Sequence, residues 1–456
     1  MAETKEIKTE LKENKMGTME VNKLLLSMSL PMMISMLVQA LYNIVDSIFV
    51  SRVNEYAVRA VSLAFPVQSL MIAIGVGTAV GINALLSRSL GEKDFEKVNR
   101  TAENGVFLAV ICYLLFLAAG FTIVRPFMES QTDIPEVRAY GISYLTICCT
   151  CSIGMFLQIV FERLLQATGK TFHTMITQGI GAIVNIILDP IMIFGLFGFP
   201  RMEAAGAAVA TVSGQIVAAI VAIIFHFRFN DEVRMKLKGF RPRLQVIGQI
   251  YAVGAPSIVM QAIGSVMTYS INLILAAYGV AQTVFGLYFK LQSFIFMPVF
   301  GLNNGMVPII AFNYGAGNKE RVIKTMKQSI LYAVSIMFVG LLIMELFPDK
   351  LLGLFNATSE LLKVGIPALR TICLSFIFAG FCIVVCSVFQ ALGNGVYSMI
   401  VSIARQLVVL IPVAYLLSLT GNVNNIWWAF PVAELMSVFM CSYFLARIYK
   451  KVIRNI

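Results

Sequence analysis

Hydrophobic stretches long enough to cross a lipid bilayer recur along the whole length of this chain. A transmembrane helix needs about 20 consecutive, mainly apolar residues. Because lipid offers the backbone no hydrogen-bond partners, a closed bundle of helices is the expected architecture. The sequence therefore predicts an all-α membrane protein with twelve transmembrane helices. The predicted spans lie at about residues 24–50, 60–88, 102–124, 137–161, 172–196, 204–227, 248–278, 284–312, 325–347, 365–389, 396–419 and 426–446.

Composition argues against a soluble protein. Hydrophobic residues make up 58% of the 456 residues and charged residues only 13%, too few to cover the surface of a soluble chain of this length. All eight cysteines fall inside predicted spans without the spacing of a zinc site or a disulfide framework, so we interpret them as packing residues. Residues 1–23 are polar and lack the apolar core of a signal peptide, which predicts a cytosolic tail.

Lys and Arg are unevenly divided between the two sides of the predicted bundle. With the N-terminus inside, 25 of the 35 Lys and Arg residues fall in inside-facing segments and 8 in outside-facing segments. This bias follows the positive-inside rule and predicts that both termini are cytosolic. The net charge of +11 is then explained by topology and by contact with anionic lipid, so binding to nucleic acid is not expected.

The longest polar interior segment begins at Arg228 and separates six predicted spans from six. The expected organisation is a cytosolic tail at 1–23, an N-lobe at 24–227, a cytosolic linker at 228–247, a C-lobe at 248–446 and a cytosolic tail at 447–456.

The two lobes repeat each other in sequence. Since each lobe has an even number of spans, the repeats are parallel and related by an axis along the membrane normal. Such transporters bind substrate near the repeat interface and rock one half against the other. The paired glycines allow helices to approach closely; we interpret them as packing positions and leave a role in sliding open. The matches at an offset of 224 residues include Gln68 with Gln292, Gly77 with Gly301, Gly81 with Gly305, Gly91 with Gly315 and Gln166 with Gln390.

An acidic residue stands in the middle of the apolar stretch "NIILDPIMIF". A carboxylate such as Asp189 costs about 2.5–3.5 kcal/mol at the centre of a membrane helix, so intramembrane acids are functional by default. Asn185 is spaced i, i+4 from it and shares its helix face. The alternative is that the intramembrane acids are protonated packing residues. The first predicted span has its own polar stripe, formed by Ser35, Gln39, Asn43 and Asp46.

The two acids are predicted at similar depth. At a rise of about 1.5 Å per residue, Asp46 and Asp189 both fall in the outer half of the bilayer, and Tyr144 and Thr211 reach a similar height. Pro190 removes a backbone donor beside Asp189 and frees a carbonyl oxygen. Carbonyl and carboxylate oxygens can hold a cation. We therefore predict a site where a proton, a sodium ion and an organic cation compete for the same negative charge.

The second half lacks this acidic pair, because Ile271 and Val413 stand at about the matching positions. Its spans carry Lys290, Arg405 and Glu434 instead. Two interpretations remain open: Lys290 and Arg405 face a central cavity, or Arg405 forms a structural ion pair with Glu434. Either way, the first half is expected to couple cations and the second to perform a different task.

Five segments stand out as a set: "SLPMMISMLVQALYNIVDSIFVS", "ERLLQATGK", "NIILDPIMIFG", "GAAVATV" and "QALGN". Together they resemble the multidrug and toxic compound extrusion (MATE) family, most closely its bacterial DinF-like and MepA-like branch, over about residues 24–446. The resemblance implies a secondary antiporter that needs no cofactor. Such a protein exports organic, often cationic and amphipathic compounds by alternating access, in exchange for inward Na⁺ or H⁺.

The same resemblance implies an ion-coupling site in the N-lobe. Its residues here would be Asp46, Asn185, Asp189, Thr211 and Tyr144, and Na⁺ would bind at the first four of these positions. Another branch of the family has acids in the seventh and tenth spans. Both of those spans lack acids in this sequence, so a cation site of that type is not expected in the C-lobe.

A substrate cavity lined by Met and aromatic side chains would suit varied amphipathic ligands. Each candidate could instead be an ordinary core or lipid-facing residue. The expected partners are small organic cations or drugs and membrane lipid, with the chain acting as a monomer. The alternative is a flippase for a lipid-linked precursor, although few basic residues are available for its headgroup; an enzyme is not expected, because no catalytic motif occurs. The cavity candidates are Met33, Met36, Gln39, Tyr42, Asn43, Phe65, Lys290 and Arg405.

Overall fold

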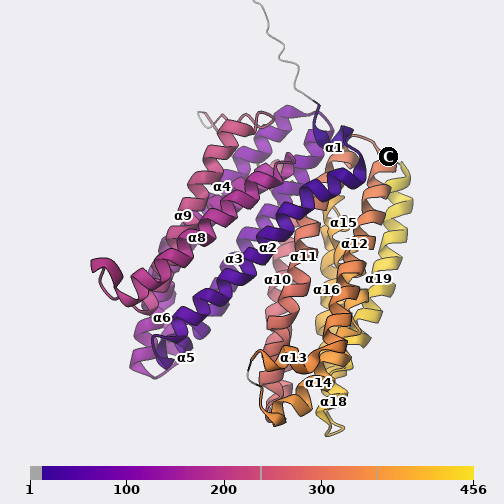
Figure 1. The fold of residues 1–456 in the computed structure, drawn as a ribbon. Coiled ribbons are helices and arrows are strands. Elements are labelled where there is room, and N and C mark those ends of the chain that lie inside the picture. Colours follow the sequence, from indigo (N-terminus) through magenta and orange to yellow (C-terminus); the bar gives the residue numbers. More distant parts are fainter. Residues whose placement is uncertain (1–12, 237–238, 356, 456) are drawn as a thin grey trace, which may run out of the picture.

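The computed structural model describes residues 13–236, 239–355 and 357–455. Within these ranges every regular element is a helix, and the helices form two bundles that lean against each other (Figure 1). Ten of the helices are long and apolar enough to cross a bilayer, and two bent helix pairs bring the number of candidate spans to twelve. The all-α prediction with twelve spans is therefore confirmed. Helix α1 and the C-terminus lie at the same end of the molecule, called here the termini end (Figure 1).

The N-lobe contains the first six spans. Its helices are α1 (Lys15–Thr18), α2 (Val21–Ser51), α3 (Glu55–Gly91), α4 (Phe95–Thr122), α5 (Val124–Gln131), α6 (Pro135–Thr150), α7 (Ile153–Ala167), α8 (Thr171–Phe194), the short η1 (Leu196–Gly198) and α9 (Ala204–Phe229).

The C-lobe contains the other six. Its helices are α10 (Leu244–Leu275), α11 (Ala281–Gly315), α12 (Lys319–Leu346), α13 (Pro348–Gly353), α14 (Ser359–Cys373), α15 (Phe376–Ala391), α16 (Gly395–Ile403), the π-helix η2 (Ala404–Leu410), α17 (Ile411–Ser418), α18 (Val423–Ile426), α19 (Ala429–Lys451) and the short η3 (Ile453–Asn455).

The repeat seen in the sequence recurs in local structure. The pair α6 and α7 bends by 45°, and the pair α14 and α15, which begins 224 residues later, bends by 48°. Asp94 caps α4 by accepting a hydrogen bond from the Lys97 backbone N–H, and Asn318 caps α12 in the same way from Arg321. Such side-chain caps satisfy backbone donors that have no partner in the first turn. Equivalent positions thus begin and bend equivalent helices in both lobes.

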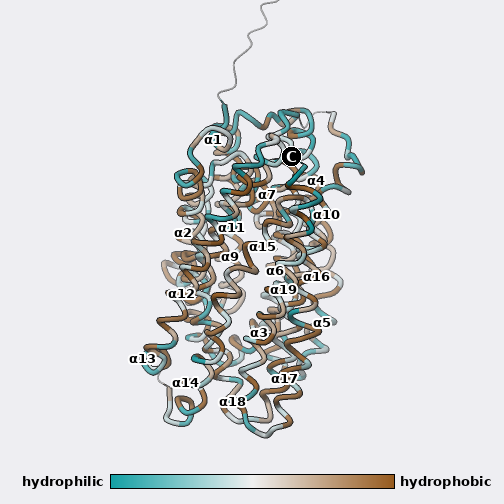
Figure 2. The backbone as a smooth tube through the Cα atoms, turned by 90° about the vertical axis from the view of Figure 1, so that its right-hand side faces the viewer, coloured by the Kyte–Doolittle hydropathy of each residue, from teal (hydrophilic) through white to brown (hydrophobic). Residues whose placement is uncertain are grey.

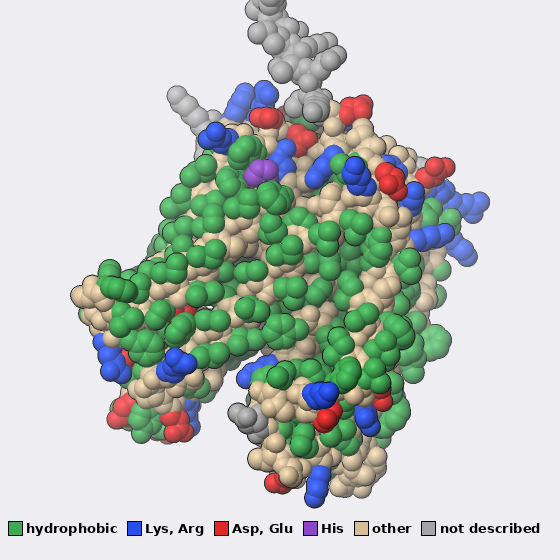
Figure 3. Space-filling model, in the orientation of Figure 1, with side chains coloured by type: hydrophobic (Ala, Val, Ile, Leu, Met, Phe, Trp, Pro, Cys, Tyr) green, Lys and Arg blue, Asp and Glu red, His purple; other side chains and the backbone are tan. Residues whose placement is uncertain are grey.

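The lobes touch through their halves nearest the termini end, where α2 packs against α11 and α3 against α10. A Cβ added to Gly81 would stand 2.1 Å from the Ile250 carbonyl oxygen, and one added to Gly91 would stand 1.9 Å from that of Phe312. In the symmetric contact, a Cβ at Gly315 would stand 2.1 Å from the Arg88 carbonyl oxygen. We call this glycine-lined contact the seam. At the opposite end the lobes diverge and leave a cleft (Figures 1 and 3).

Short helix α1 bridges the lobes at the termini end. The amide of Asn14, which precedes α1, donates to the Thr168 carbonyl oxygen of the N-lobe over 3.2 Å and to Glu232 of the linker over 2.7 Å. From the C-lobe, Asn313 and Arg321 donate to the Met16 carbonyl oxygen over 3.0 and 2.9 Å. We call residues 14–19 the strap. Residues 1–12 of the predicted tail lie outside the described residues.

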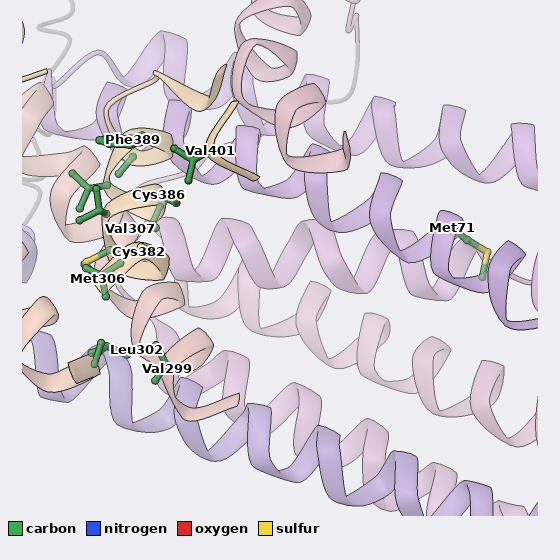
Figure 4. Packing of buried hydrophobic residues seen from close by; sticks show 14 of the residues in the cluster. Met71, Val299, Leu302, Met306, Val307, Cys382, Cys386, Phe389 and Val401 are labelled. Carbon is green, nitrogen blue, oxygen red and sulfur yellow. The ribbon is translucent and has the colours of Figure 1, made fainter. Parts of the chain in front are cut away.

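The surface and the core both match a membrane bundle. Hydrophobic side chains cover the middle of the molecule, while Lys and Arg gather mainly at the termini end (Figure 3), and the tube is most apolar between its two ends (Figure 2). In the C-lobe core, Met306, Cys382, Cys386 and Phe389 pack together (Figure 4). All eight cysteines are free thiols, as their interpretation as packing residues requires.

The helices extend beyond several predicted spans, because the polar first and last turns continue the backbone hydrogen bonding of the apolar core. Predicted span 137–161 ends six residues before α7 does, and the span predicted at 102–124 begins at Phe95 in α4. Pro190 does not break its helix, since α8 continues through it to Phe194.

Candidate functional site

Asp189 lies in the interior of the N-lobe, where α8 packs against α2 and α9. Its side chain is inaccessible to solvent, and within the residues that the structure describes neither carboxylate oxygen has a hydrogen-bond partner. A buried polar group without a partner is costly and rare. This carboxylate therefore needs an occupant that can supply positive charge or a proton.

Asn185 stands one turn before Asp189 on the same face of α8. Its side-chain nitrogen donates to the Thr211 hydroxyl of α9 over 3.3 Å. Because the amide nitrogen is used in this way, its oxygen is left as an acceptor, and that oxygen is buried without a partner. The Asn185–Thr211 bond thus fixes the orientation of an unused acceptor beside the carboxylate of Asp189.

Asp46 on α2 completes the acidic pair. It stands on the helix that packs against α8, and one of its oxygens is buried without a partner in the described part of the chain. Tyr42 and Tyr144 lie within electrostatic range of Asp46, and the Tyr144 hydroxyl accepts a hydrogen bond from Gln68 over 3.0 Å. The structure therefore brings the five predicted ion-site residues into one region of the N-lobe.

The five predicted ion-site residues together present more hydrogen-bond acceptors than donors. Four oxygen atoms have no partner among the described residues: both of Asp189, one of Asp46 and the side-chain oxygen of Asn185. Oxygen donors of this kind suit hard cations such as Na⁺, and carboxylates can equally take a proton. Chemically, this part of the N-lobe can hold a small cation or a proton.

A cavity of about 180 Å³ lies next to this group, nearer the termini end. We call it the N-lobe cavity. Its wall includes Met36, Gln39 and Tyr42 of α2 with Asn185 and Thr211, all five of which were predicted from sequence. Asp46 and Asp189 follow Tyr42 and Asn185 by one helical turn, so the acids lie just beyond one end of the cavity.

Glu162 also lines the N-lobe cavity and was missed by the sequence analysis. It is 4% exposed on α7 and accepts hydrogen bonds from Gln158 over 3.0 Å, Thr177 over 3.2 Å and Gln178 over 2.8 Å. The predicted span ended at residue 161, which placed Glu162 in a loop. Its i, i+4 spacing from Gln158 was the available signal that the helix and its polar face continue.

A larger cavity of about 510 Å³ lies mainly in the C-lobe. We call it the C-lobe cavity. Arg405 of η2 and Glu434 of α19 both line it, and they form an ion pair with an N–O distance of 2.7 Å. The two interpretations offered for Arg405 therefore hold together, because this residue faces the cavity and is paired.

A hydrogen bond between the lobes separates the two cavities. Arg163 of α7 donates through Nη1 to Asn304 of α11 over 2.9 Å and to Gln166 over 2.9 Å. Arg163 and Asn304 line both cavities. A ligand that moves between the two sites must pass or break this contact, which we call the partition.

Four cavity candidates lie outside both linings. Lys290 is exposed and stands 5.9 Å from the Phe355 ring centroid; it is two residues, or about 200° of helix rotation, from cavity-lining Tyr288 and Gln292. Met33 packs at the seam against Gly301. Asn43 is exposed one position beyond the α2 face that lines the cavity. Phe65 is 62% exposed and precedes cavity-lining Ile72 by about two turns.

The sequence profile of the MatE family matches residues 31–191 and 256–416. These two matched segments cover most of both lobes and correspond to the two repeats. The chain belongs to the MatE family. Among its relatives, the multidrug export protein MepA of Staphylococcus haemolyticus is 28% identical over 427 residues, 92% of each chain. MepA of Staphylococcus aureus strain bovine RF122 is 27% identical over 421 residues, 91% of each chain.

Solved structures of MatE proteins share this fold. One, described as the outward-facing conformation of a multidrug resistance MATE family transporter, superposes with a TM-score of 0.91 at 24% identity, over 98% of this chain and 99% of its own. Another, a MATE in the straight conformation, gives a TM-score of 0.90 at 25% identity, over 97% and 99%. Membership of this family, whose relatives are named as export proteins, makes the chain a multi-pass membrane transporter and not an enzyme.

Proposed function

We propose that this MatE protein is a secondary antiporter of the bacterial plasma membrane. It exports amphipathic organic cations or drugs in exchange for inward Na⁺ or H⁺. The observation that carries the proposal is the group of four partnerless acceptor oxygens around Asp46, Asn185 and Asp189. The export direction is supported by its relatives, which are named as multidrug export proteins.

Exchange follows from competition for one negative charge. Two carboxylates that repel each other in a buried site are stabilised by any cation or proton that enters. When Na⁺ or H⁺ occupies the site, a cationic substrate in the adjoining N-lobe cavity loses its electrostatic partner and is released. When substrate binds, the ion is released instead. The energy of the inward ion gradient is thereby used to export the substrate.

Alternating access uses the seam and the partition. We assign the termini end to the cytosol, because Lys and Arg gather there (Figure 3). The lobes touch at that end and diverge at the other (Figure 1), which corresponds to an outward-open state. Opening to the cytosol requires the seam to part and the Arg163–Asn304 bond to break. A rocking motion of this kind is typical of transporters built from repeats.

The flippase alternative is weaker. A lipid-linked anionic headgroup would need several unpaired basic residues in the cavity. Of the two considered, Lys290 lies outside the lining and Arg405 is paired with Glu434.

Asp189→Asn tests the antiport proposal in proteoliposomes. The variant should lose ion-driven export of a cationic dye such as ethidium, down to the leak of protein-free liposomes, while its melting temperature stays within a few degrees of the parent. Asp349→Asn, which changes an exposed carboxylate on α13, is the matched control and should export normally. Sodium and pH gradients imposed separately identify the coupling ion. Normal ion-driven export by Asp189→Asn would overturn the assignment.

A further inference from the structure

The C-lobe cavity differs from the N-lobe site in the sign and balance of its charges. Its lining carries two guanidinium groups, Arg163 and Arg405, and one carboxylate, Glu434. Arg163 lies beside the carboxylate of Glu162 and Arg405 is paired with Glu434, so a bare cation that entered the cavity would find no uncompensated carboxylate. We propose that the C-lobe cavity is a second substrate site, which takes amphipathic zwitterions bearing a carboxylate and an amino or iminium group.

Unused hydrogen-bonding atoms support this complementarity. Within the described part of the chain, the Arg405 guanidinium is hydrogen-bonded only through Nη1, to Glu434, and so retains donors for a ligand carboxylate. One Glu434 oxygen and the side-chain oxygens of Gln292 and Asn303 are buried without partners, and these can accept from a ligand N–H group. A zwitterion satisfies both sets and leaves the charge of the site unchanged, which avoids the cost of a buried uncompensated charge.

The remaining wall is apolar and adaptable. Thioether and aromatic side chains can adjust to flat organic molecules of different shapes. A volume of about 510 Å³ falls within the range for sites that bind drug-sized ligands. The apolar residues of the wall include Met260, Met267, Met297, Phe296, Phe300 and Phe430.

Arg405 is presented by an unusual backbone. It belongs to the seven-residue π-helix η2, whereas the matching segment of α8 in the N-lobe is regular α-helix. π-Helical turns are rare, and they occur frequently at functional sites. Since the repeat does not require this distortion, its position at the cavity points to a task that only the C-lobe performs.

The inference deepens the proposed function, on which it rests, by naming a substrate class for export. Its test, however, is equilibrium binding without any ion gradient. Two dyes that differ by a single methyl ester serve as probes: rhodamine 110, a zwitterion with a free carboxylate, and rhodamine 123, its cationic methyl ester. Their fluorescence anisotropy is titrated with the purified full-length protein in phosphatidylglycerol nanodiscs.

The double variant Arg405→Gln/Glu434→Gln removes both charges together and leaves a neutral amide pair. It should weaken rhodamine 110 binding at least about tenfold, equivalent to about 1.4 kcal/mol, and change rhodamine 123 binding less than about threefold. Asp189→Asn should show the opposite pattern, weakening the cationic ester and sparing the zwitterion. Retained rhodamine 123 binding also shows that the double variant is folded.

If the double variant does not fold, Arg405→Lys provides the same test, because it keeps the charge but loses the fork of donors that a carboxylate prefers. It should weaken rhodamine 110 binding about threefold or more. Absence of saturable rhodamine 110 binding to the parent would overturn the proposal. Equal losses for both dyes, or loss of rhodamine 110 binding only in Asp189→Asn, would do so as well. Continued ion-driven export by Asp189→Asn would instead contradict the antiport proposal alone.

Phosphatidylethanolamine carries a comparable pair of charges in its headgroup. Repeating the titration in nanodiscs that contain this lipid separates the two sources of zwitterion. Competition that removes rhodamine 110 binding would identify a lipid headgroup as the natural occupant, and unchanged binding would identify a dissolved compound. Either result supports the proposed chemistry of the site.

Discussion

The two lobes share one backbone plan but bury different chemistry. In the N-lobe, Asp46 and Asp189 lie near a cavity of about 180 Å³ and carry acceptor oxygens that lack partners among the described residues. In the C-lobe, Arg405 and Glu434 are paired across the wall of a cavity of about 510 Å³. The helix bends and the helix caps recur in both lobes. A duplicated scaffold thus keeps the features that form helices, while its polar interior residues are free to diverge.

This difference has an energetic meaning. The N-lobe carboxylates are left unsatisfied in the absence of an ion, so that part of the molecule gains most from binding one. In the C-lobe, Arg405 and Glu434 largely neutralise each other. A ligand therefore adds favourable electrostatic interactions there only if it has both a positive and a negative group. We therefore expect opposite responses when one charged group is removed from each lobe.

The largest expected contrast is in folding stability. Glu434→Gln should destabilise the protein by about 1–3 kcal/mol, because it leaves the partly buried Arg405 guanidinium, whose side chain is 26% exposed, without its counter-charge. Asp189→Asn should cost less than about 1 kcal/mol, because Asp189 has no hydrogen bond to lose. Thermal or denaturant unfolding in detergent measures both. Adding Arg405→Gln to Glu434→Gln should recover most of the lost stability. If Glu434→Gln and Asp189→Asn destabilise the protein equally, the proposed difference between the lobes is wrong.

A moderate effect is expected at Thr211, which holds the Asn185 amide by a hydrogen bond of 3.3 Å. Thr211→Val keeps the shape but removes the hydroxyl, and it should weaken coupling-ion binding about fivefold, or about 1 kcal/mol. Thr211→Ser should restore it.

The matched control for this prediction lies in the other lobe. Leu435 stands at the equivalent position of the repeat and has no hydroxyl, so Leu435→Val should leave the ion dependence of transport unchanged. If Thr211→Val and Leu435→Val shift the half-saturating ion concentration equally, the hydrogen bond has no role in coupling.

The smallest expected effect concerns the strap. Burial raises the pKa of Glu232 above its ordinary value, although Lys170 and the amide of Asn14 oppose the shift. The folded state therefore favours the protonated carboxyl. This contribution to stability is fully present below the ordinary pKa of about 4.3 and is lost as pH rises through the raised value.

Glu232→Gln should flatten this pH dependence, with a change below about 1 kcal/mol. The C-lobe attachment of the strap is expected to be insensitive over the same range, because Arg321 stays charged. Hydrogen exchange of residues 14–19 between pH 4 and 7 checks both statements. Exchange that depends on pH as strongly in Glu232→Gln as in the parent would refute the role of this carboxyl.

Much of the architecture follows from patterns along the chain. Apolar stretches of bilayer length specify the spans, and the offset of 224 residues specifies the repeat. The acids were found because a lone charge such as Asp189 stands out against an apolar background. Asn185 and Asp46 followed from helical spacing alone.

Other features depend on how helices rotate and pair, which spacing along one helix does not determine. Glu162 was hidden by a helix that continues past its apolar core. The partition joins Arg163 to Asn304, 141 residues away. Lys290 was misplaced because a charge within a span can lie on either face of its helix. The π-helix was not predicted, since the residues of η2 have no distinctive composition.

The glycine-lined seam has a consequence for building new transporters. At the seam, the backbones of helices from the two lobes touch directly. This contact requires glycine at the points of closest approach, and it does not depend on a particular set of larger side chains. An interface of that kind selects its partner mainly by the geometry of the backbone, with a few side-chain hydrogen bonds such as Arg163–Asn304 added to it. Halves taken from two related proteins should therefore assemble into a working hybrid if the small residues stay in register, which would let the preferences of each half be combined at will.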